Sequence, residues 1–471
     1  MNKIFQFPNP FVKKSRKKTI PVFFIAQDDF KSWLKKQKKI WQTQLEQNGY
    51  NAKESQAYDI KNNKAETEAI LCSISDPIHY LDGANAADFI QKNFSQEFLS
   101  QYFFTIESKH EHDDIVKLCI GWGLAHYKFE TYKEDKSNTA QLSLPSTVAA
   151  EEVGSYVDSV SLIRNLINTP AIDLGTNELA NAAKELAKTH KAKTEVIKGK
   201  ELETGFPMIH CVGMASPRPP QLVDLKWGKA KNPRVTIVGK GIVYDTGGLN
   251  LKPGMYMRDM KKDMGGAAHA LGLANMIMSQ NLPVNLRVLL PIAENAVAGN
   301  SYRPGDVLQT RKGLTVEIND TDAEGRLVVA DALTYACEEK SDLLIDFCTL
   351  TGAARVALGY DIPVFFSNND NYIDDLKDKS VHADDPVWPL PLWQGYKKEM
   401  NSGIADMSNE GTGRAGAIHG ALFLDAFTDQ KTDWIHFDCY AWEQNGKPGR
   451  PKGGADTGMR AMFDFIKRKY G

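Results

Sequence analysis

The pattern of apolar and polar positions along the chain predicts alternating strands and helices. Short apolar runs typical of strands lie at 22–25, 235–238, 284–290, 314–318 and 343–347. Longer segments with helical spacing occur between them, among them 265–279 and 326–339. Alternation of this kind predicts an α/β fold in which helices pack against a central sheet.

A change of pattern near residue 145 predicts a domain boundary. Residues 1–145 combine short apolar runs with amphipathic segments such as 31–47 and 114–128, as a small α/β domain does. A polar stretch then leads to a helical segment that Ser146 or Thr147 could cap. We predict a smaller N-terminal α/β domain (1–145), a connecting helix (146–168) and a C-terminal α/β domain (169–471) with a mixed central sheet flanked by helices.

The N-terminal region carries a feature with two interpretations. Basic residues at 13–18 precede the apolar run 20–26 and loosely resemble the start of a signal peptide. The run contains Pro21, however, and polar residues follow it where a cleavage site would need small ones. We therefore expect a buried strand at 22–25.

Composition narrows the class of protein. The 471 residues include 57 Lys and Arg against 59 Asp and Glu, a net charge of −2, which gives no sign of a nucleic-acid partner. No stretch reaches the roughly 18 apolar residues that span a membrane. The six cysteines lie far apart without a C-x-x-C pair, which indicates buried thiols in a reducing cytoplasm.

Candidate chemistry gathers at the ends of the predicted strands, where open α/β sheets bind ligands. Gly239-Lys240-Gly241 follows one strand but lacks the spacing of a phosphate-binding loop. Each acidic residue taken alone is more often a turn residue or a helix cap. If they converge, four negative charges need compensation, which two divalent cations supply, and a neutral Lys240 could then be a ligand. These four acids are Asp245, Asp263, Asp322 and Glu324.

Other catalytic patterns are missing from the sequence. None of the ten histidines lies in H-E-x-x-H, and no G-x-S-x-G is present. We expect His269 to be a packed helical residue, with His419 and His436 similar, and His110 and His112 to be surface residues. A C-terminal group of aromatic residues is expected in the core or at a subunit contact rather than stacking on nucleic-acid bases. Its members are Trp388, Trp393, Trp434, Tyr440 and Trp442.

Four motifs make the chain resemble the cytosolic leucyl aminopeptidase family, metallopeptidases that remove N-terminal amino acids. The motifs are VGKG at 238–241, YDTGG at 244–248, DMGGAA at 263–268 and TDAEGRL at 321–327. The resemblance covers about residues 165–465. It is weak over residues 1–145, which in this family form a variable N-terminal domain before the catalytic domain.

The resemblance implies roles for particular residues. It assigns the tighter of two metals to Lys240, Asp245, Asp263 and Glu324, and the more exchangeable one to Asp245, Asp322 and Glu324. It makes Lys252 the residue that polarises the scissile carbonyl and Arg326 the holder of a bicarbonate ion that shuttles protons. The substrate pocket would be lined by Met260, Thr349 and Gly352.

The resemblance also implies a reaction and an assembly. Two divalent cations, Zn²⁺ or Mn²⁺, would bridge a water and present hydroxide to the first peptide bond. Because the implied pocket is uncharged, we expect Leu or Met as first residue over Asp or Glu. The family's homohexamer, a dimer of trimers, is expected. The alternative is a hexameric DNA-binding or regulatory protein with incidental peptidase activity, which the near-neutral charge disfavours.

Overall fold

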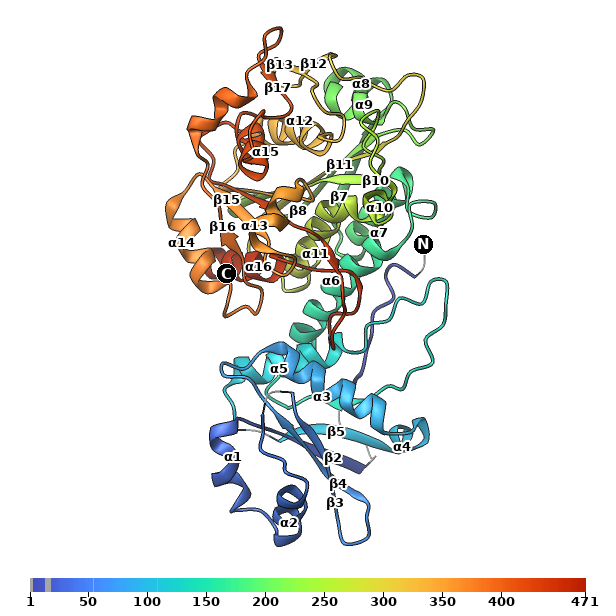
Figure 1. Ribbon diagram of the computed structural model, residues 1–471, viewed down its shortest axis with the longest axis vertical. Coiled ribbons are helices and arrows are strands. Elements are labelled where there is room, and N and C mark those ends of the chain that lie inside the picture. Colours follow the sequence, from blue (N-terminus) through green and yellow to red (C-terminus); the bar gives the residue numbers. More distant parts are fainter. Residues whose placement is uncertain (1–2, 13–17, 54, 108) are drawn as a thin grey trace. The chain divides into compact units, whose positions relative to one another are not determined.

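The computed structural model describes residues 3–12, 18–53, 55–107 and 109–471 (Figure 1). The basic residues 13–17 lie outside the described residues. The chain divides into an N-terminal unit, formed by 6–161 with 445–452, and a C-terminal unit, formed by 1–5, 162–444 and 453–471. Both units combine strands and helices, so the prediction of a two-domain α/β fold is confirmed.

The N-terminal unit is built on a six-stranded sheet in the order β1-β6-β5-β2-β4-β3. Neighbouring strands are parallel except β3 and β4, which are antiparallel. The buried strand expected at 22–25 is the second half of β2. The strands are β1 (Phe11–Val12), β2 (Lys18–Ile25), β3 (Ala57–Lys61), β4 (Thr67–Ser73), β5 (Tyr102–Glu107) and β6 (Leu142–Ser143).

Helices cover both faces of this sheet (Figure 1). Phe30 and Trp41, from α1 and α2, pack with Leu71 of β4 on one face. Trp122 of α5 packs against Phe104 of β5, and α5 also packs on α3. The helices of this unit are α1 (Gln27–Leu34), α2 (Lys39–Gln47), α3 (Tyr80–Asn93), α4 (Gln96–Gln101) and α5 (His112–Leu124).

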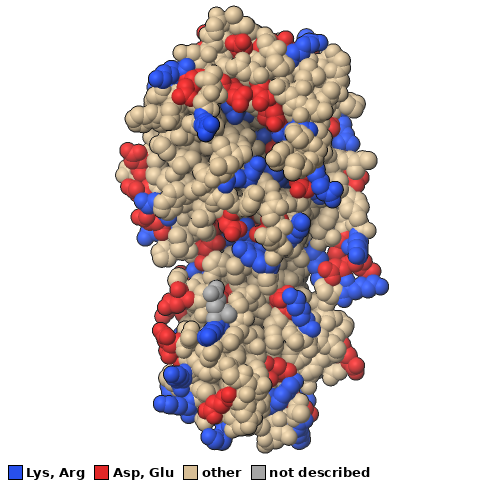
Figure 2. Space-filling model, in the orientation of Figure 1, with Lys and Arg blue, Asp and Glu red and all other residues tan. Residues whose placement is uncertain are grey.

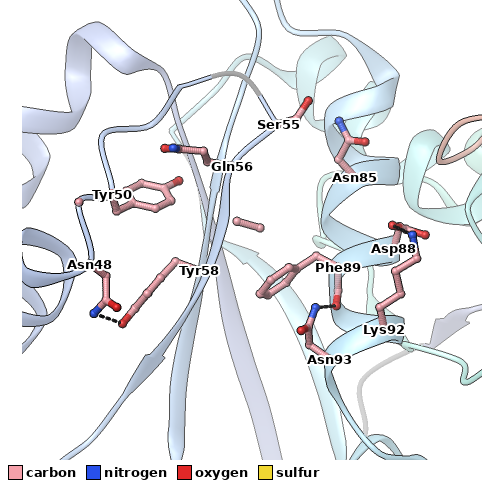
Figure 3. A pocket seen from close by; sticks show the side chains of 12 residues that line it. Asn48, Tyr50, Ser55, Gln56, Tyr58, Asn85, Asp88, Phe89, Lys92 and Asn93 are labelled. Atoms are coloured by element: carbon pink, nitrogen blue, oxygen red, sulfur yellow. Dashed lines mark hydrogen bonds and ion pairs between the residues drawn. The ribbon is translucent and has the colours of Figure 1, made fainter.

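A cavity of about 500 Å³ lies in the N-terminal unit beside α3 (Figure 3). Tyr50, Tyr58 and Phe89 contribute aromatic walls. Asn48 Nδ2 donates to Tyr58 Oη at 2.8 Å, and Asn93 Nδ2 donates to the carbonyl oxygen of Phe89 at 2.8 Å. Polar groups of the cavity wall therefore bond to one another. All the site residues predicted from the sequence lie in the C-terminal unit.

The C-terminal unit contains a mixed sheet in the order β16-β15-β18-β14-β9-β11-β8-β7, with β10 added beside the end of β11. Strands β18, β14, β9 and β11 are mutually parallel, whereas β8 runs antiparallel to β11 and β15 antiparallel to β18. The strands are β7 (Lys193–Lys198), β8 (Gln221–Gly228), β9 (Arg234–Gly239), β10 (Gly241–Asp245), β11 (Asn285–Asn295), β14 (Leu343–Cys348), β15 (Val364–Ser367), β16 (Trp388–Pro389) and β18 (Trp434–Asp438).

Two helical layers enclose the sheet (Figure 1). Helices α9 (Pro207–Gly213), α12 (Gly325–Cys337) and α15 (Gly416–Asp425) form one layer, and α7 (Thr176–Thr189), α11 (Gly265–Ser279) and α16 (Met459–Tyr470) form the other. Both layers bury their apolar faces. Shorter elements complete the unit: α8 (Lys200–Gly205), α10 (Gly254–Met257), η1 (Met260–Met264), α13 (Gly352–Leu358), α14 (Asp370–Lys379), η2 (Gln394–Met400), β12 (Val307–Gln309), β13 (Thr315–Glu317), β17 (Met407–Ser408), β19 (Trp442–Glu443) and β20 (Gly453–Gly454).

Several predicted elements differ from the structure at their ends. The segment 31–47 is divided between α1 and α2, with a break at 35–38. The helix predicted from residue 146 is α6 (Ala150–Asn168), which begins later because the Val148 N–H first closes a turn on the carbonyl of Pro145. Within the described residues, no helix is both long enough and apolar enough to cross a membrane.

Candidate functional site

Parallel strands bring the first predicted site residues to one edge of the C-terminal sheet. Lys240 follows β9, and Asp245 ends β10. The backbone of Lys240 donates to the Phe347 carbonyl at 3.0 Å and accepts from Ala267 N–H at 2.8 Å, which fixes it between β14 and α11. A Cβ atom on Gly266 would lie 2.0 Å from the Phe347 carbonyl oxygen, so only glycine fits at this approach.

The remaining acids reach the same edge from loops. Asp263 lies in η1, and Asp322 and Glu324 lie in the turn before α12. Gly325 begins α12, and a Cβ atom there would lie 2.5 Å from Lys240 Nζ. Glycine at this position therefore leaves the space that the lysine side chain occupies.

Lys240 contacts two of the four predicted acids. Its Nζ lies 2.7 Å from Asp263 Oδ2 and 3.0 Å from Glu324 Oε1, and it donates to the Thr349 carbonyl at 3.1 Å. Thr349 Oγ1 donates to Asp263 Oδ1 at 2.7 Å. Lys240, Asp263 and Glu324 are almost completely buried, so water does not screen these charges.

Lys252 contacts the other two acids. Its Nζ lies 2.9 Å from Asp245 Oδ2 and also contacts Asp322 Oδ1. Asp245 Oδ1 accepts hydrogen bonds from Gly247 N–H and from Asn295 Nδ2, both at 2.8 Å. The two lysines therefore connect all four predicted acids into one cluster.

Asn295 is a residue that the sequence reasoning missed. Besides Asp245, its Nδ2 contacts the Thr321 carbonyl at 3.1 Å, which also accepts from Tyr302 Oη at 2.8 Å. Asn295 thus orients one acid and the turn that carries two others. Its position at the end of β11, opposite Asp245 at the end of β10, was the available signal.

The carboxylates in this cluster have perturbed pKa values. Burial, and then the charge of Asp245, raise the pKa of Glu324 well above its usual range and that of Asp322 to about 7. Burial also acts against ionisation of Asp263, but Lys240 and Lys262 together outweigh it and lower the pKa of Asp263. Burial favours a neutral Lys240, but the nearby acids, Asp263 and Glu324 above all, outweigh burial and raise the pKa of Lys240. Four carboxylates thus face only two ammonium groups.

The donor set fits divalent cations. Carboxylate oxygens of Asp245, Asp322 and Glu324 all lie within 4.8 Å of one another. Asp263 Oδ2, Asp322 Oδ1 and Glu324 Oε1 are buried and have no partner with hydrogen-bond geometry, although each is near a lysine ammonium. Clustered, unpaired carboxylate oxygens of this kind are ligands for hard divalent ions.

The other predicted residues surround this cluster. Arg326 is buried in the first turn of α12 and donates from Nη1 to the Asn409 carbonyl at 2.7 Å, while its Nε has no hydrogen-bond partner. Met260 begins η1, three residues before Asp263. Gly352 begins α13 and is exposed. In the part of the chain that the structure describes, none of these three forms a hydrogen bond or ion pair with a cluster carboxylate, unlike Thr349.

A second group of ionisable residues lies deeper in the sheet. His436 Nδ1 is 2.6 Å from Asp346 Oδ1, and Cys348 Sγ donates to the same oxygen at 3.2 Å. Trp434 Nε1 donates to Asp346 Oδ2 at 2.8 Å. These side chains are fully buried and both oxygens of Asp346 are satisfied, so we interpret the group as a structural core network.

The remaining sequence expectations have mixed outcomes. His269 is buried in α11 and accepts from Thr457 N–H at 3.0 Å, as expected for a packed residue. The six cysteines are free, four of them buried. Trp434 and Trp442 belong to the core, whereas Trp388 and Trp393 are 50% and 61% exposed. Trp388 begins the edge strand β16 and Trp393 lies just before η2, so both stand at the edge of the sheet rather than in the core.

In comparisons with known proteins, both units match domains of one protein family. Residues 161–463 match the "Cytosol aminopeptidase family, catalytic domain", and residues 20–145 match the "M17 aminopeptidase, N-terminal domain". A probable cytosol aminopeptidase of Geobacter sp. is 37% identical over 369 residues, which cover 75% of each chain. One from Chlamydia felis is 42% identical over 322 residues, covering 67% of this chain and 64% of that one.

Solved structures agree with the sequence comparisons. The crystal structure of cytosol aminopeptidase from Coxiella burnetii has a TM-score of 0.92 and 42% identity, and covers 98% of this chain and 100% of that one. The bottromycin maturation enzyme BotP in complex with Mn has a TM-score of 0.84 and 26% identity, and covers 96% and 99%. Both units and the motifs therefore lead to one conclusion: the chain belongs to the M17 cytosol aminopeptidase family, whose members are metal-dependent exopeptidases.

Proposed function

We propose that this protein is a dinuclear aminopeptidase that hydrolyses the first peptide bond of peptides and prefers Leu-like or Met-like first residues. The observation that carries the proposal is the largely buried cluster of four carboxylates, which only two lysine ammoniums contact and three of whose oxygens lack a partner with hydrogen-bond geometry. An acidic cluster this deeply buried is unfavourable unless cations compensate it.

Two divalent cations, Zn²⁺ or Mn²⁺, fit the proposal. Lys240, Asp245, Asp263 and Glu324 would hold the tighter one, and Asp245, Asp322 and Glu324 the more exchangeable one. Oxygen and amine donors are compatible with either metal. The relationship to BotP, a protein solved with Mn, supports manganese as one of the two candidates.

Divalent cations held by these residues would supply the acidity that makes a water a hydroxide nucleophile near neutral pH. The protein's own residues would then act on the peptide. Lys252 has its ammonium within the carboxylate cluster, beside Asp245. It would polarise the scissile carbonyl and stabilise the developing oxyanion. Arg326 would hold bicarbonate as a proton shuttle, a role that its free Nε supports.

Met260, Thr349 and Gly352 are proposed to line the pocket for the first side chain. Gly352 leaves room at the start of α13, and Thr349 has its hydroxyl committed to Asp263, so its methyl group is available for apolar contact. An apolar side chain has no charge whose hydration would be lost when it enters such a pocket. This argument favours Leu or Met over polar residues of similar size.

We further propose a homohexamer, a dimer of trimers, located in the cytoplasm. The C-terminal unit of a single chain exposes large apolar side chains that subunit contacts would cover. They include Leu251, Met255, Tyr256, Trp393 and Ile404, each 59% to 79% exposed. Free cysteines and relatives named cytosol aminopeptidases support the location. A particle near the mass of one 52.4 kDa chain in light scattering would contradict the hexamer.

The alternative of a DNA-binding hexamer is not favoured. Lys and Arg side chains are interspersed with Asp and Glu on the face that Figure 2 shows, and the net charge is −2. Nucleic-acid binding draws most of its affinity from phosphate contacts with clustered basic residues.

We keep the boundaries 1–145, 146–168 and 169–471 as proposed N-terminal domain, connecting helix and catalytic domain.

The reaction can be tested with a pair of substrates that differ only at the amine. The purified protein, loaded with Zn²⁺ or Mn²⁺, should cleave Leu-p-nitroanilide and leave N-acetyl-Leu-p-nitroanilide intact. Bestatin should inhibit, and o-phenanthroline should inactivate until metal is restored. Elemental analysis should give two metals per chain. Equal cleavage of both substrates, or indifference to chelation, would reject the proposed function.

A further inference from the structure

Two cationic side chains flank one aromatic ring at the end of the C-terminal sheet. Lys262 Nζ lies 4.9 Å from the centre of the Tyr440 ring, and Arg355 Cζ lies 4.5 Å from it. Lys262 is only 3% exposed, and Arg355 is half-buried. Among the described residues, neither forms an ion pair with a carboxylate.

This cluster of Lys262, Arg355 and Tyr440 adjoins the proposed substrate pocket. Lys262 lies in η1 between Met260 and Asp263. A Cβ atom on Gly352 would lie 3.5 Å from Arg355 Nη2, so the guanidinium stands directly beside that pocket residue. Arg355 Nη1 also donates to the Thr351 carbonyl at 3.3 Å, which holds it there.

Among the described residues, no carboxylate pairs directly with this cluster, although the charge of Asp263 acts on Lys262. The nearest acid in sequence, Asp263, already engages Lys240 and Thr349. The ring of Tyr440 stabilises a cation, but its quadrupole replaces only part of the hydration that a buried ammonium loses. Cations filling the proposed metal sites would make the surroundings more positive still. An anion is therefore the missing partner.

We propose that Lys262 and Arg355 recognise a carboxylate of the substrate, an inference that rests on the proposed aminopeptidase function. The carboxylate has two possible sources: an acidic side chain on the first residue, or the free C-terminus of a very short peptide. Both present the same planar anion, which an Arg guanidinium and a Lys ammonium bind through charge-assisted hydrogen bonds.

The inference modifies one expectation from the sequence. An uncharged pocket would reject Asp and Glu, because their carboxylates would be buried without a partner. Lys262 and Arg355 provide that partner. Apolar first residues remain preferred, but Glu is expected to be a better substrate than its neutral isostere Gln, which the proposed function alone does not predict.

The first test compares Glu-p-nitroanilide with Gln-p-nitroanilide on the metal-loaded protein. The ratio of their kcat/KM values should exceed one and should fall about tenfold in Lys262→Met and in Arg355→Gln, as loss of a charge-assisted contact requires. Dividing by the Gln value within each variant cancels any general loss of activity or folding. Lys262→Arg should restore most of the ratio.

Lys261→Met is the matched control. Lys261 is the next residue of η1, but its Nζ donates to the Asn168 carbonyl at 2.6 Å and lies 5.6 Å from the Trp442 ring. Removing this charge should leave the Glu/Gln ratio unchanged. An equal fall in this variant would show a general effect of charge and would overturn the assignment to Lys262.

The second test addresses the C-terminal source by comparing Leu-Leu with Leu-Leu-amide. A fall of this ratio in Lys262→Met, with the Glu/Gln ratio unchanged, identifies the peptide C-terminus as the carboxylate. Wild-type cleavage of Leu-p-nitroanilide with both ratios unaltered in both variants overturns the inference and leaves the proposed function standing. No cleavage of Leu-p-nitroanilide by the loaded wild type rejects the proposed function itself.

Discussion

Replacing Glu324 by glutamine should make the metal-free protein more stable and the enzyme inactive. Glu324 is 1% exposed, and its Oε1 lies 3.0 Å from Lys240 Nζ without hydrogen-bond geometry. Burial, and then Asp245, raise the pKa of Glu324 well above its usual value. The charged side chain is therefore unfavourable in the folded protein when no cation compensates it.

The size of the effect follows from the cost of burying a charged acceptor that lacks hydrogen-bond geometry. That cost is about 1 to 3 kcal/mol, and glutamine removes the charge while keeping the shape of Glu324. Lys240 retains Asp263 at 2.7 Å, so the substitution leaves no unpaired ammonium. A gain of about 1 to 3 kcal/mol corresponds to a rise in Tm of about 2 to 10 °C for a domain of this size.

The gain should depend on pH. Because the pKa of Glu324 is raised in the folded protein, its contribution to stability is present below its usual value of 4.5 and is lost as pH rises above it. Glutamine does not ionise. In EDTA, the difference in unfolding free energy between Glu324→Gln and the wild type should therefore grow from about pH 5 to about pH 8.

Metal should reverse the order of stabilities. Cations at about 100 times their Kd stabilise the wild type by about 2.7 kcal/mol per site, whereas Glu324→Gln should gain little and lose at least about 100-fold in turnover. Thermal unfolding with and without Mn²⁺ measures both effects. A lower Tm of the variant in EDTA, or an intact metal response, would refute the reasoning.

Asp331→Asn is the matched control. Asp331 is also buried, and burial raises its pKa to about 7, but its two oxygens accept from Arg311 N–H and Met208 N–H, both at 2.9 Å. Asparagine retains one acceptor for two donors. This variant should lose about 1 to 3 kcal/mol and keep the wild-type response to metal.

Further predictions concern catalysis, core charge and pH. Lys252→Ala and Arg326→Ala should keep two metals per chain in elemental analysis while kcat falls; loss of metal would reject their assigned roles. Arg287→Met should cost about 3 to 5 kcal/mol in urea unfolding, because it leaves buried Asp224, 2.8 Å from Nη2, with only Lys226 Nζ, at 3.5 Å, among the described cations, and adding Asp224→Leu should recover most of it. Burial lowers the pKa of His126 from 6.5 to about 4, so the unfolded chain protonates first and stability is lost as pH falls between these values. The loss is about 3 kcal/mol, and an equally steep decline in His126→Gln would contradict it.

Local sequence pattern was sufficient for much of the fold. The apolar runs at 235–238 and 343–347 correspond to β9 and β14, and the helical spacing at 265–279 corresponds to α11. Such elements are predictable because the side-chain periods of strands and helices are local properties of the backbone. The ends of elements were less predictable, as α6 illustrates, because turns such as the one at Pro145 compete with the first helical hydrogen bonds.

The candidate site was predictable where motifs and strand ends coincide. Lys240 follows β9, Asp245 ends β10 and Glu324 precedes a helix, so the rule that ligands bind at strand ends predicted that they lie close together. Asn295 was missed because a single asparagine at a strand end has no distinctive neighbours in the sequence. Its importance comes from the hydrogen bond to Asp245, a residue on another strand.

The sequence by itself thus determined the two-domain α/β class, the order of the elements and which acids could bind cations. Only the tertiary structure decided which charges are paired. No pattern in the sequence distinguishes Lys262, yet the fold buries its ammonium against Tyr440 and beside Arg355. The physical reason is that desolvation and charge pairing depend on every group within a few ångströms, and those groups come from strands and helices far apart in the chain.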